Sequence, residues 1–140
     1  RRLTETRFST GAHAVLESTW GGSLADMVRF VQEMGIVRDE RLIEQVPAKA
    51  GRLVRGLADL EREFSRLLFN VRGLGLYQGF TMRQPPWRDA LVDGALQEAS
   101  LLLLGAGRSS VRLRPSLSVT NEDIDLLIDK LRRCLARIAA

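Results

Sequence analysis

The sequence has few of the residues that build disulfides and metal sites. Its 140 residues include one cysteine, Cys134, and one histidine, His13. A single thiol cannot form an internal disulfide, and two ligands fall short of the three or four that an ordinary zinc site needs. At this length a folded chain buries roughly 70% of the surface it exposes when unfolded, so a core can be stable without either device. The sequence therefore excludes a disulfide scaffold and a zinc finger.

Long apolar stretches and long runs of one charge are also missing. The longest apolar run, residues 101–104, is far shorter than the ~20 residues that cross a bilayer. No apolar stretch follows the charged residues at the amino terminus, so they do not form a secretory signal, and cytoplasm is the expected compartment. The 21 basic and 17 acidic residues give a net charge of +4, but acids fall among the arginines throughout. We therefore expect no nucleic-acid partner and no membrane partner.

The composition, with 45% apolar and 27% charged residues, is that of one soluble globular domain. Apolar residues recur at helical spacing in four segments. Pro47 should bend or interrupt the second of them. The predicted helices run from a Ser23 cap to near Gly35, from about 40 to 65, from 87 to about 100, and from a Thr120 cap to the end of the chain.

Between the second and third helices the pattern changes to branched and aromatic residues broken by glycines. Residues 67–82 predict two short strands that meet at a glycine turn. Residues 101–104 predict a buried strand, and residues 110–115 alternate as a further strand after a turn. The sequence therefore predicts an α+β fold, with a small, mostly antiparallel sheet of about three to four strands and helices packed on one face.

Two hydroxyls and two glycines stand immediately before the first predicted helix, in Ser18-Thr19-Trp20-Gly21-Gly22-Ser23. A helix amino terminus has unpaired N–H donors and partial positive charge, and glycines let a ligand approach the backbone. The segment is therefore suited to holding a phosphate. A loop that ends in a serine cap accounts for the same residues.

Arg112 and Arg114 alternate with apolar residues in the strand predicted over 110–115, so both arginines lie on one side of it. A guanidinium fork matches a carboxylate with two parallel hydrogen bonds and cannot shed its charge. The pair is therefore a candidate carboxylate site. An exposed edge strand, or an internal salt bridge to one of the acids, is the structural alternative.

Three other features carry no predicted role in binding. Glycines 73 and 75 lack the strand, glycine-rich loop and helix order of a phosphate loop, and a turn explains them better. His13 stands in a polar stretch and is expected to be exposed. Cys134, beside the inner face of the last helix, is expected to be a small packing residue.

Three segments in this order resemble the carboxyl-terminal part of class III pyridoxal-phosphate aminotransferases, nearest to the lysine ε-aminotransferase branch. They are STWGGSLADMVR at 18–29, NVRGLGL at 70–76 and GRSSVRLRPSLSVT at 107–120. The resemblance covers residues 15–137 and implies the small domain of that family at 39–140. It implies that residues 1–38 are a loop and connecting helix belonging to the large cofactor-binding domain.

The resemblance also implies roles for individual residues. The threonine before the aromatic-Gly-Gly element, here Thr19 with Ser18 beside it, would bind the phosphate of pyridoxal 5'-phosphate in the neighbouring subunit of a homodimer. Arg112 matches the strand arginine that grips a substrate carboxylate. Arg114 would support it without contact, and Arg72 matches a recurrent arginine with a structural role.

The covalent partner of the cofactor has no match in this sequence. In the family the lysine that binds pyridoxal phosphate covalently, and the aspartate that pairs with its ring nitrogen, lie further upstream than this chain extends. The two lysines present, Lys49 and Lys130, stand on amphipathic helices, where solvation favours the charged form. We therefore expect an aminotransferase that moves an amino group from an amine-bearing substrate, such as lysine, to 2-oxoglutarate, with this chain inactive alone. A non-catalytic dimerisation domain derived from the same fold is the alternative.

Overall fold

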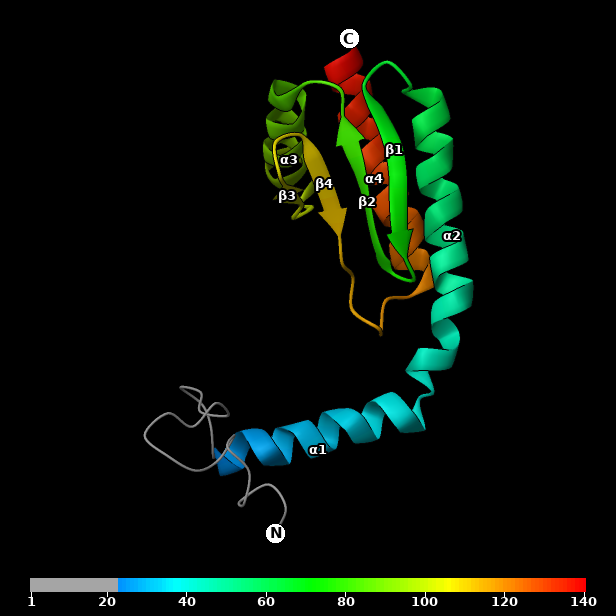
Figure 1. Cartoon of the computed structure of the whole chain (residues 1–140), viewed down its shortest axis with the longest axis vertical. Helices are drawn as coiled ribbons and strands as arrows, with labels where there is room; N and C mark the ends of the chain where they lie inside the picture. The colour runs from blue at the N-terminus through cyan, green and yellow to red at the C-terminus, as the bar shows by residue number, and fades with distance from the viewer. Residues whose placement is uncertain (1–22) are drawn as a thin grey trace, which may run out of the picture. The chain divides into compact units, whose positions relative to one another are not determined.

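The computed structural model describes residues 23–140 in two units, Ser23–Glu40 and Arg41–Ala140 (Figure 1), and each is described by itself. The first unit contains one helix, α1 (Leu24–Asp39). Ser23 caps it as predicted, because its hydroxyl accepts a hydrogen bond from the N–H of Asp26 at 3.3 Å. The predicted end at Gly35 was wrong. The helix continues because the glycine stays helical, and the N–H of Glu40 still donates to the carbonyl of Ile36 at 2.9 Å.

None of the residues of α1 is buried within the described part of the chain. The helix has the apolar spacing that the sequence predicts, yet all of its large apolar side chains except the half-buried Val37 lie at the surface. They are Leu24, Met27, Val28, Phe30, Val31, Met34 and Ile36.

The second unit combines three helices with a four-stranded antiparallel sheet, which confirms the predicted α+β class. The helices are α2 (Leu42–Glu63), α3 (Pro85–Ala99) and α4 (Asn121–Ala139). Pro47 does not interrupt α2. Helix α3 begins two residues before the predicted start, because proline is well suited to the first turn of a helix.

The strands follow the order β1-β2-β4-β3, so the second and third strands of the chain are not neighbours in the sheet. Strands β1 (Leu68–Leu74) and β2 (Tyr77–Met82) form the predicted hairpin, and β4 (Ser110–Leu113) lies beside β2. The edge strand β3 (Leu104–Ala106) pairs with β4 over three residues only.

The prediction of a buried strand at 101–104 was wrong. Only Leu104 of this run belongs to a strand, and Leu102 is 72% exposed. The run connects Ser100, the left-handed residue at the end of α3, to the edge strand. Its apolar composition reflects the packing of Leu101 and Leu103 on the core, and not pairing in the sheet. The predicted turn is correspondingly shorter, since Gly105 and Ala106 lie in β3.

All three helices cover the same face of the sheet, with α4 between α2 and α3 (Figure 1). Inward side chains of the strands, among them Phe80, Met82 and Val111, meet the apolar stripes of the helices in one core. A fully buried side chain of this size contributes about 1.5–3 kcal/mol to folding. Cys134 is 6% exposed and packs in this core, as predicted. Within Arg41–Ala140, the other face of the sheet has no helical layer.

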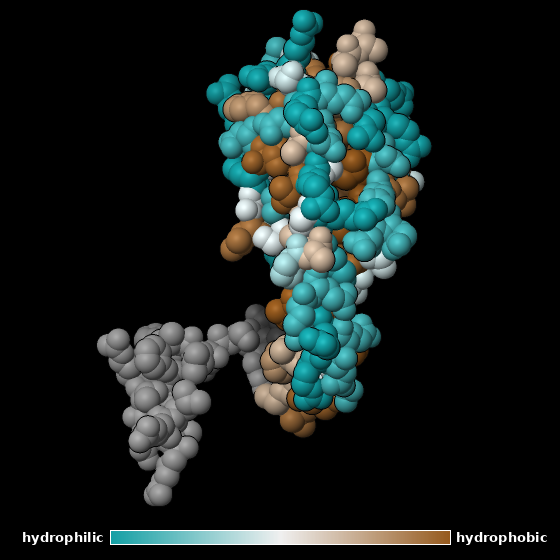
Figure 2. Space-filling view, turned by 90° about the vertical axis from the view of Figure 1, so that its right-hand side faces the viewer, coloured by the Kyte–Doolittle hydropathy of each residue, from teal (hydrophilic) through white to brown (hydrophobic). Residues whose placement is uncertain are grey.

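The helix side of the domain is covered by charged residues. Figure 2 shows a mainly hydrophilic surface on the α2 side, with hydrophobic side chains visible between the charged ones. No helix within residues 23–140 has the length and hydropathy of a membrane-crossing segment.

Helices α2 and α4 approach closely at Gly56. A Cβ at this position would lie 2.6 Å from Cγ1 of Ile128, whereas a Cβ at Gly51 of the same helix would meet nothing nearer than Nη1 of Arg55 at 3.4 Å. We predict that Gly56→Ala lowers the free energy of unfolding by about 1–3 kcal/mol through overpacking. Gly51→Ala should raise it by about 0.5–1 kcal/mol through backbone entropy. Urea unfolding of both variants measures this, and equal effects would contradict the close approach.

The amino terminus of α4 gives a pH-dependent prediction. Hydrogen bonds from the N–H and hydroxyl of Thr120 lower the pKa of the Asp123 carboxyl below its ordinary 3.8. A lowered folded-state pKa stabilises the fold above the unfolded value, and this contribution is lost as the pH falls through the folded value. The stability difference between the native chain and Asp123→Asn should therefore be constant near neutral pH and shrink below about pH 4. Thermal unfolding at a series of pH values tests this prediction. Glu122→Gln, a substitution in the same helical turn, is the control, and its stability difference from the native chain should change less with pH.

Candidate functional site

Arg112 lies in the interior of the sheet, on the face that carries no helix. Its strand, β4, has β2 on one side and β3 on the other, and Arg112 pairs in register with Gly79 and with Leu104. Val111 and Leu113, the residues before and after it, are buried against the helices. Side chains alternate along a strand, so Arg112 projects from the opposite, open face. The alternative of an exposed edge strand is therefore wrong.

The strands contain no acidic residue. The expectation that acids fall among the arginines throughout was wrong here. Positions 64–88 and 99–121 have neither aspartate nor glutamate, whereas arginines stand at 66, 72, 83, 88, 108, 112 and 114. Within residues 23–140, no carboxylate forms an ion pair with Arg112. An internal salt bridge therefore does not explain Arg112 in the described part of the chain. The open sheet face is a positively charged surface with an exposed guanidinium at its centre.

A hollow of about 140 Å³ lies on this face between Arg112 and Arg72. Its floor is Gly79, where a Cβ would lie 2.8 Å from the carbonyl oxygen of Val111, so the close strand packing leaves no room for a side chain. Since a water molecule takes up about 30 Å³, the hollow has room for a carboxylate and a few carbon atoms. The arrangement can therefore bind a small organic anion.

Arg114, the second arginine of the predicted pair, lies just beyond the end of β4. It is exposed and borders two other hollows beside Pro115, and Arg112 also lines one of them, of about 360 Å³. The two arginines therefore share that hollow, whereas the hollow over Gly79 is bordered by Arg112 and not by Arg114.

Arg72 is held firmly at the other side of the hollow. Its Nη1 donates to Oγ1 of Thr81 and to the carbonyl of Asn70, both at 2.9 Å, and its Nη2 donates to Oγ of Ser110 at 3.1 Å. Sequence reasoning gave Arg72 a structural role and did not place it beside Arg112. The absence of acids over 64–88 and 99–121 is the sequence signal that was missed, because it indicates that the strand arginines share a cationic face.

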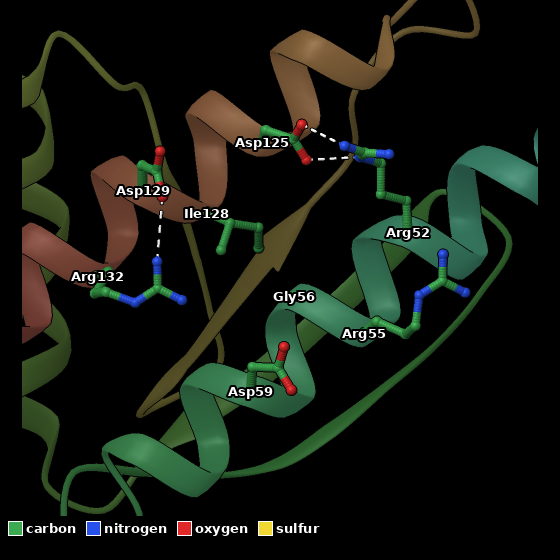
Figure 3. A pocket seen from close by; sticks show the side chains of 8 residues that line it. All are labelled: Arg52, Arg55, Gly56, Asp59, Asp125, Ile128, Asp129 and Arg132. Atoms are coloured by element: carbon green, nitrogen blue, oxygen red, sulfur yellow. Dashed lines mark hydrogen bonds and ion pairs between the residues drawn. The ribbon is translucent and has the colours of Figure 1, made fainter.

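A larger groove of about 510 Å³ separates α2 from α4 (Figure 3), but most of its charged side chains are already paired. Arg52 forms a bidentate pair with Asp125 at 2.5 and 2.6 Å, and Arg132 binds Asp129 at 3.2 Å. The hydrogen bonds from Arg52 hold the pKa of the Asp125 carboxyl below its ordinary value. A ligand would have to displace these pairs, so the groove is a poorer candidate than the open sheet face.

The two lysines are not solvated as expected. Nζ of Lys49 donates to the carbonyl of Leu117 at 3.1 Å, and Nζ of Lys130 donates to the carbonyl of Ser100 at 3.4 Å. Both side chains are half-buried. Each Nζ is already engaged by a main-chain carbonyl, so neither lysine is positioned as a free nucleophile.

Other reactive groups offer no site among residues 23–140. Burial raises the pKa of the Cys134 thiol, which disfavours the reactive thiolate. No cluster of three or more potential metal ligands occurs in the described residues. Ser18 and Thr19, the predicted phosphate ligands, and His13 lie outside the described residues.

Comparison with known proteins connects this geometry to a family. The aminotransferase class-III model matches residues 4–135. The L-lysine-epsilon aminotransferase of Mycobacterium tuberculosis (strain ATCC 25618 / H37Rv) is 35% identical over 120 residues, 86% of this chain and 26% of that protein. The acetylornithine aminotransferase of Thermosynechococcus vestitus is 33% identical over 135 residues, 95% of this chain and 32% of that protein.

The fold agrees with the sequence comparison. A solved structure of lysine aminotransferase from M. tuberculosis matches with a TM-score of 0.84 at 31% identity, over 98% of this chain and 31% of that one. The chain thus spans between a quarter and a third of the length of the relatives it matches. The match over almost the whole chain, in sequence and in fold, shows that the chain belongs to the class III aminotransferases.

Proposed function

We propose that this chain forms the carboxyl-terminal part of a pyridoxal-phosphate aminotransferase that moves an amino group to 2-oxoglutarate. The donor is an amine-bearing substrate, with the ε-amine of L-lysine as the candidate because of the relatives at 35% identity. In this proposal residues 39–140 are the small domain and residues 1–38 connect to the large one. The observation that carries it is the unpaired Arg112 on an acid-free sheet face.

Arg112 would hold a carboxylate of the substrate. Its fork can donate two parallel hydrogen bonds to one carboxylate, and hydrogen bonds to charged groups contribute about 1.5–3 kcal/mol each when they are shielded from water. Because β4 is held on both sides, the guanidinium starts from a rigid strand and not from a loop. A carboxylate fixed in this way orients the reacting carbon of the substrate.

The cofactor would be held by other residues of the chain. Thr19, with Ser18, would anchor the phosphate of pyridoxal phosphate in the neighbouring subunit of a homodimer. When bound, this cofactor supplies the electron sink for the reaction. Lys49 and Lys130 do not fit the role of its covalent partner, because each ammonium donates to a main-chain carbonyl. The chain alone is therefore proposed to be inactive.

A non-catalytic dimerisation or interaction domain of the same fold is the second candidate. It is favoured by the lack of a suitable lysine in residues 23–140 and by the exposed apolar side chains of α1. The reading frame that precedes Arg1 distinguishes the two. A covalent-lysine motif and a ring-pairing aspartate there support the enzyme, and a start codon or an unrelated domain supports the interaction module.

We predict that incubation of the chain with pyridoxal phosphate and borohydride gives no stoichiometric labelling of Lys49 or Lys130. Each Nζ donates to a main-chain carbonyl and would have to give up this contact before it could attack an aldehyde. Mass spectrometry of the digested chain measures the adducts. Complete, site-specific labelling of either lysine would show that this chain carries its own covalent anchor.

We predict that Arg112→Gln weakens binding of 2-oxoglutarate to the chain by about five- to tenfold, because it removes a charge-assisted bidentate contact. Arg114→Gln removes the same charge and should change the affinity by less than about twofold, since Arg114 does not border the hollow over Gly79. Titrations followed by ¹H–¹⁵N spectra of the labelled chain give both constants. Equal effects of the two substitutions would show that the affinity depends on net charge alone, and would overturn the role of Arg112.

A further inference from the structure

The position of Arg72 goes beyond a structural role. The register places Arg72 opposite Gly79 and Gly79 opposite Arg112, so the two arginines flank the glycine in one row across three strands. Residues that pair in register project from the same face of a sheet. Neighbouring strands lie about 4.8 Å apart, so the Cα atoms of the two arginines are roughly 10 Å apart. The two arginine side chains therefore start on either side of a floor that has no side chain, and both line the hollow above it.

The guanidinium of Arg72 is fixed over Thr81 and Ser110, which pair one side-chain row along from Gly79 and Arg112. Its bond to Oγ of Ser110 shows that it reaches across β2 to β4. Ser110 precedes Arg112 by two residues on that strand, which corresponds to about 7 Å. Thr81 and Ser110, whose hydroxyl oxygens are 3.0 Å apart, form a pair that holds the guanidinium in this place.

The partners of Arg72 are all neutral, so they fix its position without cancelling its charge. Within residues 23–140 neither Arg72 nor Arg112 has an acidic partner. The hydrogen bonds of Arg72 use three of its five N–H donors, which leaves two. Two like charges held near each other repel, and an anion with two negative groups relieves this repulsion better than an anion with one.

We propose that Arg72 is a second cationic anchor of the Arg112 site and makes the open sheet face select dicarboxylates over monocarboxylates. One carboxylate of the ligand lies on Arg112, and the second lies toward the guanidinium that Thr81 and Ser110 hold. The inference rests on the proposed function for Arg112 and adds a residue that determines specificity.

The test compares two probes that differ by one carboxylate, glutarate and butyrate, at constant ionic strength. Binding to the ¹⁵N-labelled full chain is followed through backbone N–H signals and the Nε–H signals of the arginines. The native chain should bind glutarate about five- to tenfold more tightly than butyrate. Arg72→Gln should reduce this preference to about twofold, the ratio expected from counting two equivalent carboxylates, and leave the butyrate constant unchanged.

Two further variants separate recognition from folding and from net charge. Arg133→Gln removes one positive charge from α4, on the helix side of the sheet, and should keep the native preference. Ser110→Ala keeps the charge of Arg72 but releases its Nη2, and should give an intermediate preference. If Arg72→Gln loses the dispersed spectrum of a folded chain, the Ser110→Ala result decides, and an unchanged preference in it overturns the inference.

The outcomes distinguish this inference from the proposed function. If Arg72→Gln keeps the native preference for glutarate, or weakens the binding of both probes by the same factor, Arg72 has only a structural role. The proposed dicarboxylate site is then wrong. A native chain with no preference leads to the same conclusion. If Arg112→Gln weakens the binding of neither probe, or if neither probe binds to the native chain, the proposed role of Arg112 is wrong as well.

Discussion

The antiparallel pairing of β2 with β4 is the contact on which the candidate site depends. The two strands are separated in sequence by α3 and β3, and their register alone places Gly79 beside Arg112. Since side chains alternate along a strand, a slip of one residue would turn Arg112 into the core and bring Val111 to the surface. The core opposes such a slip, because Val111 and Phe80 are each 1% exposed. Burial on the helix side of the sheet thus fixes the chemistry on the open side.

A separation of charge between helices and strands gives the open face its character. The acids of the domain lie on the helices, where pairs such as Arg52 with Asp125 and Arg132 with Glu63 connect α2 to α4. Exposed pairs of this kind add little to stability, because water and salt screen them. The strands themselves, from Leu68 to Met82 and from Leu104 to Leu113, carry no carboxylate. The strand arginines are left to meet an anion from outside.

Much of the fold follows from the sequence, and the exceptions have physical causes. Helix α4 was predicted well because a Thr120 cap and a continuous apolar stripe agree with each other. The run at 101–104 misled because apolar composition alone does not say whether a segment pairs in a sheet, and here only Leu104 has a partner strand. Arg112 was identifiable from its alternation with buried residues. Its position in one row with Arg72 could not be predicted, because the register across three strands depends on tertiary pairing that local sequence patterns do not encode.

The solvent exposure of Arg112 limits what this domain achieves alone. Water and salt ions compete strongly with an exposed guanidinium for a carboxylate, so such contacts are weak. The same contact becomes several times stronger when the surroundings exclude water, because the effective dielectric constant falls. Exclusion of water also favours the neutral, nucleophilic form of a lysine, so anion binding and covalent chemistry both gain from a dry site. Protein that covered the open sheet face would therefore strengthen the contact between Arg112 and a carboxylate.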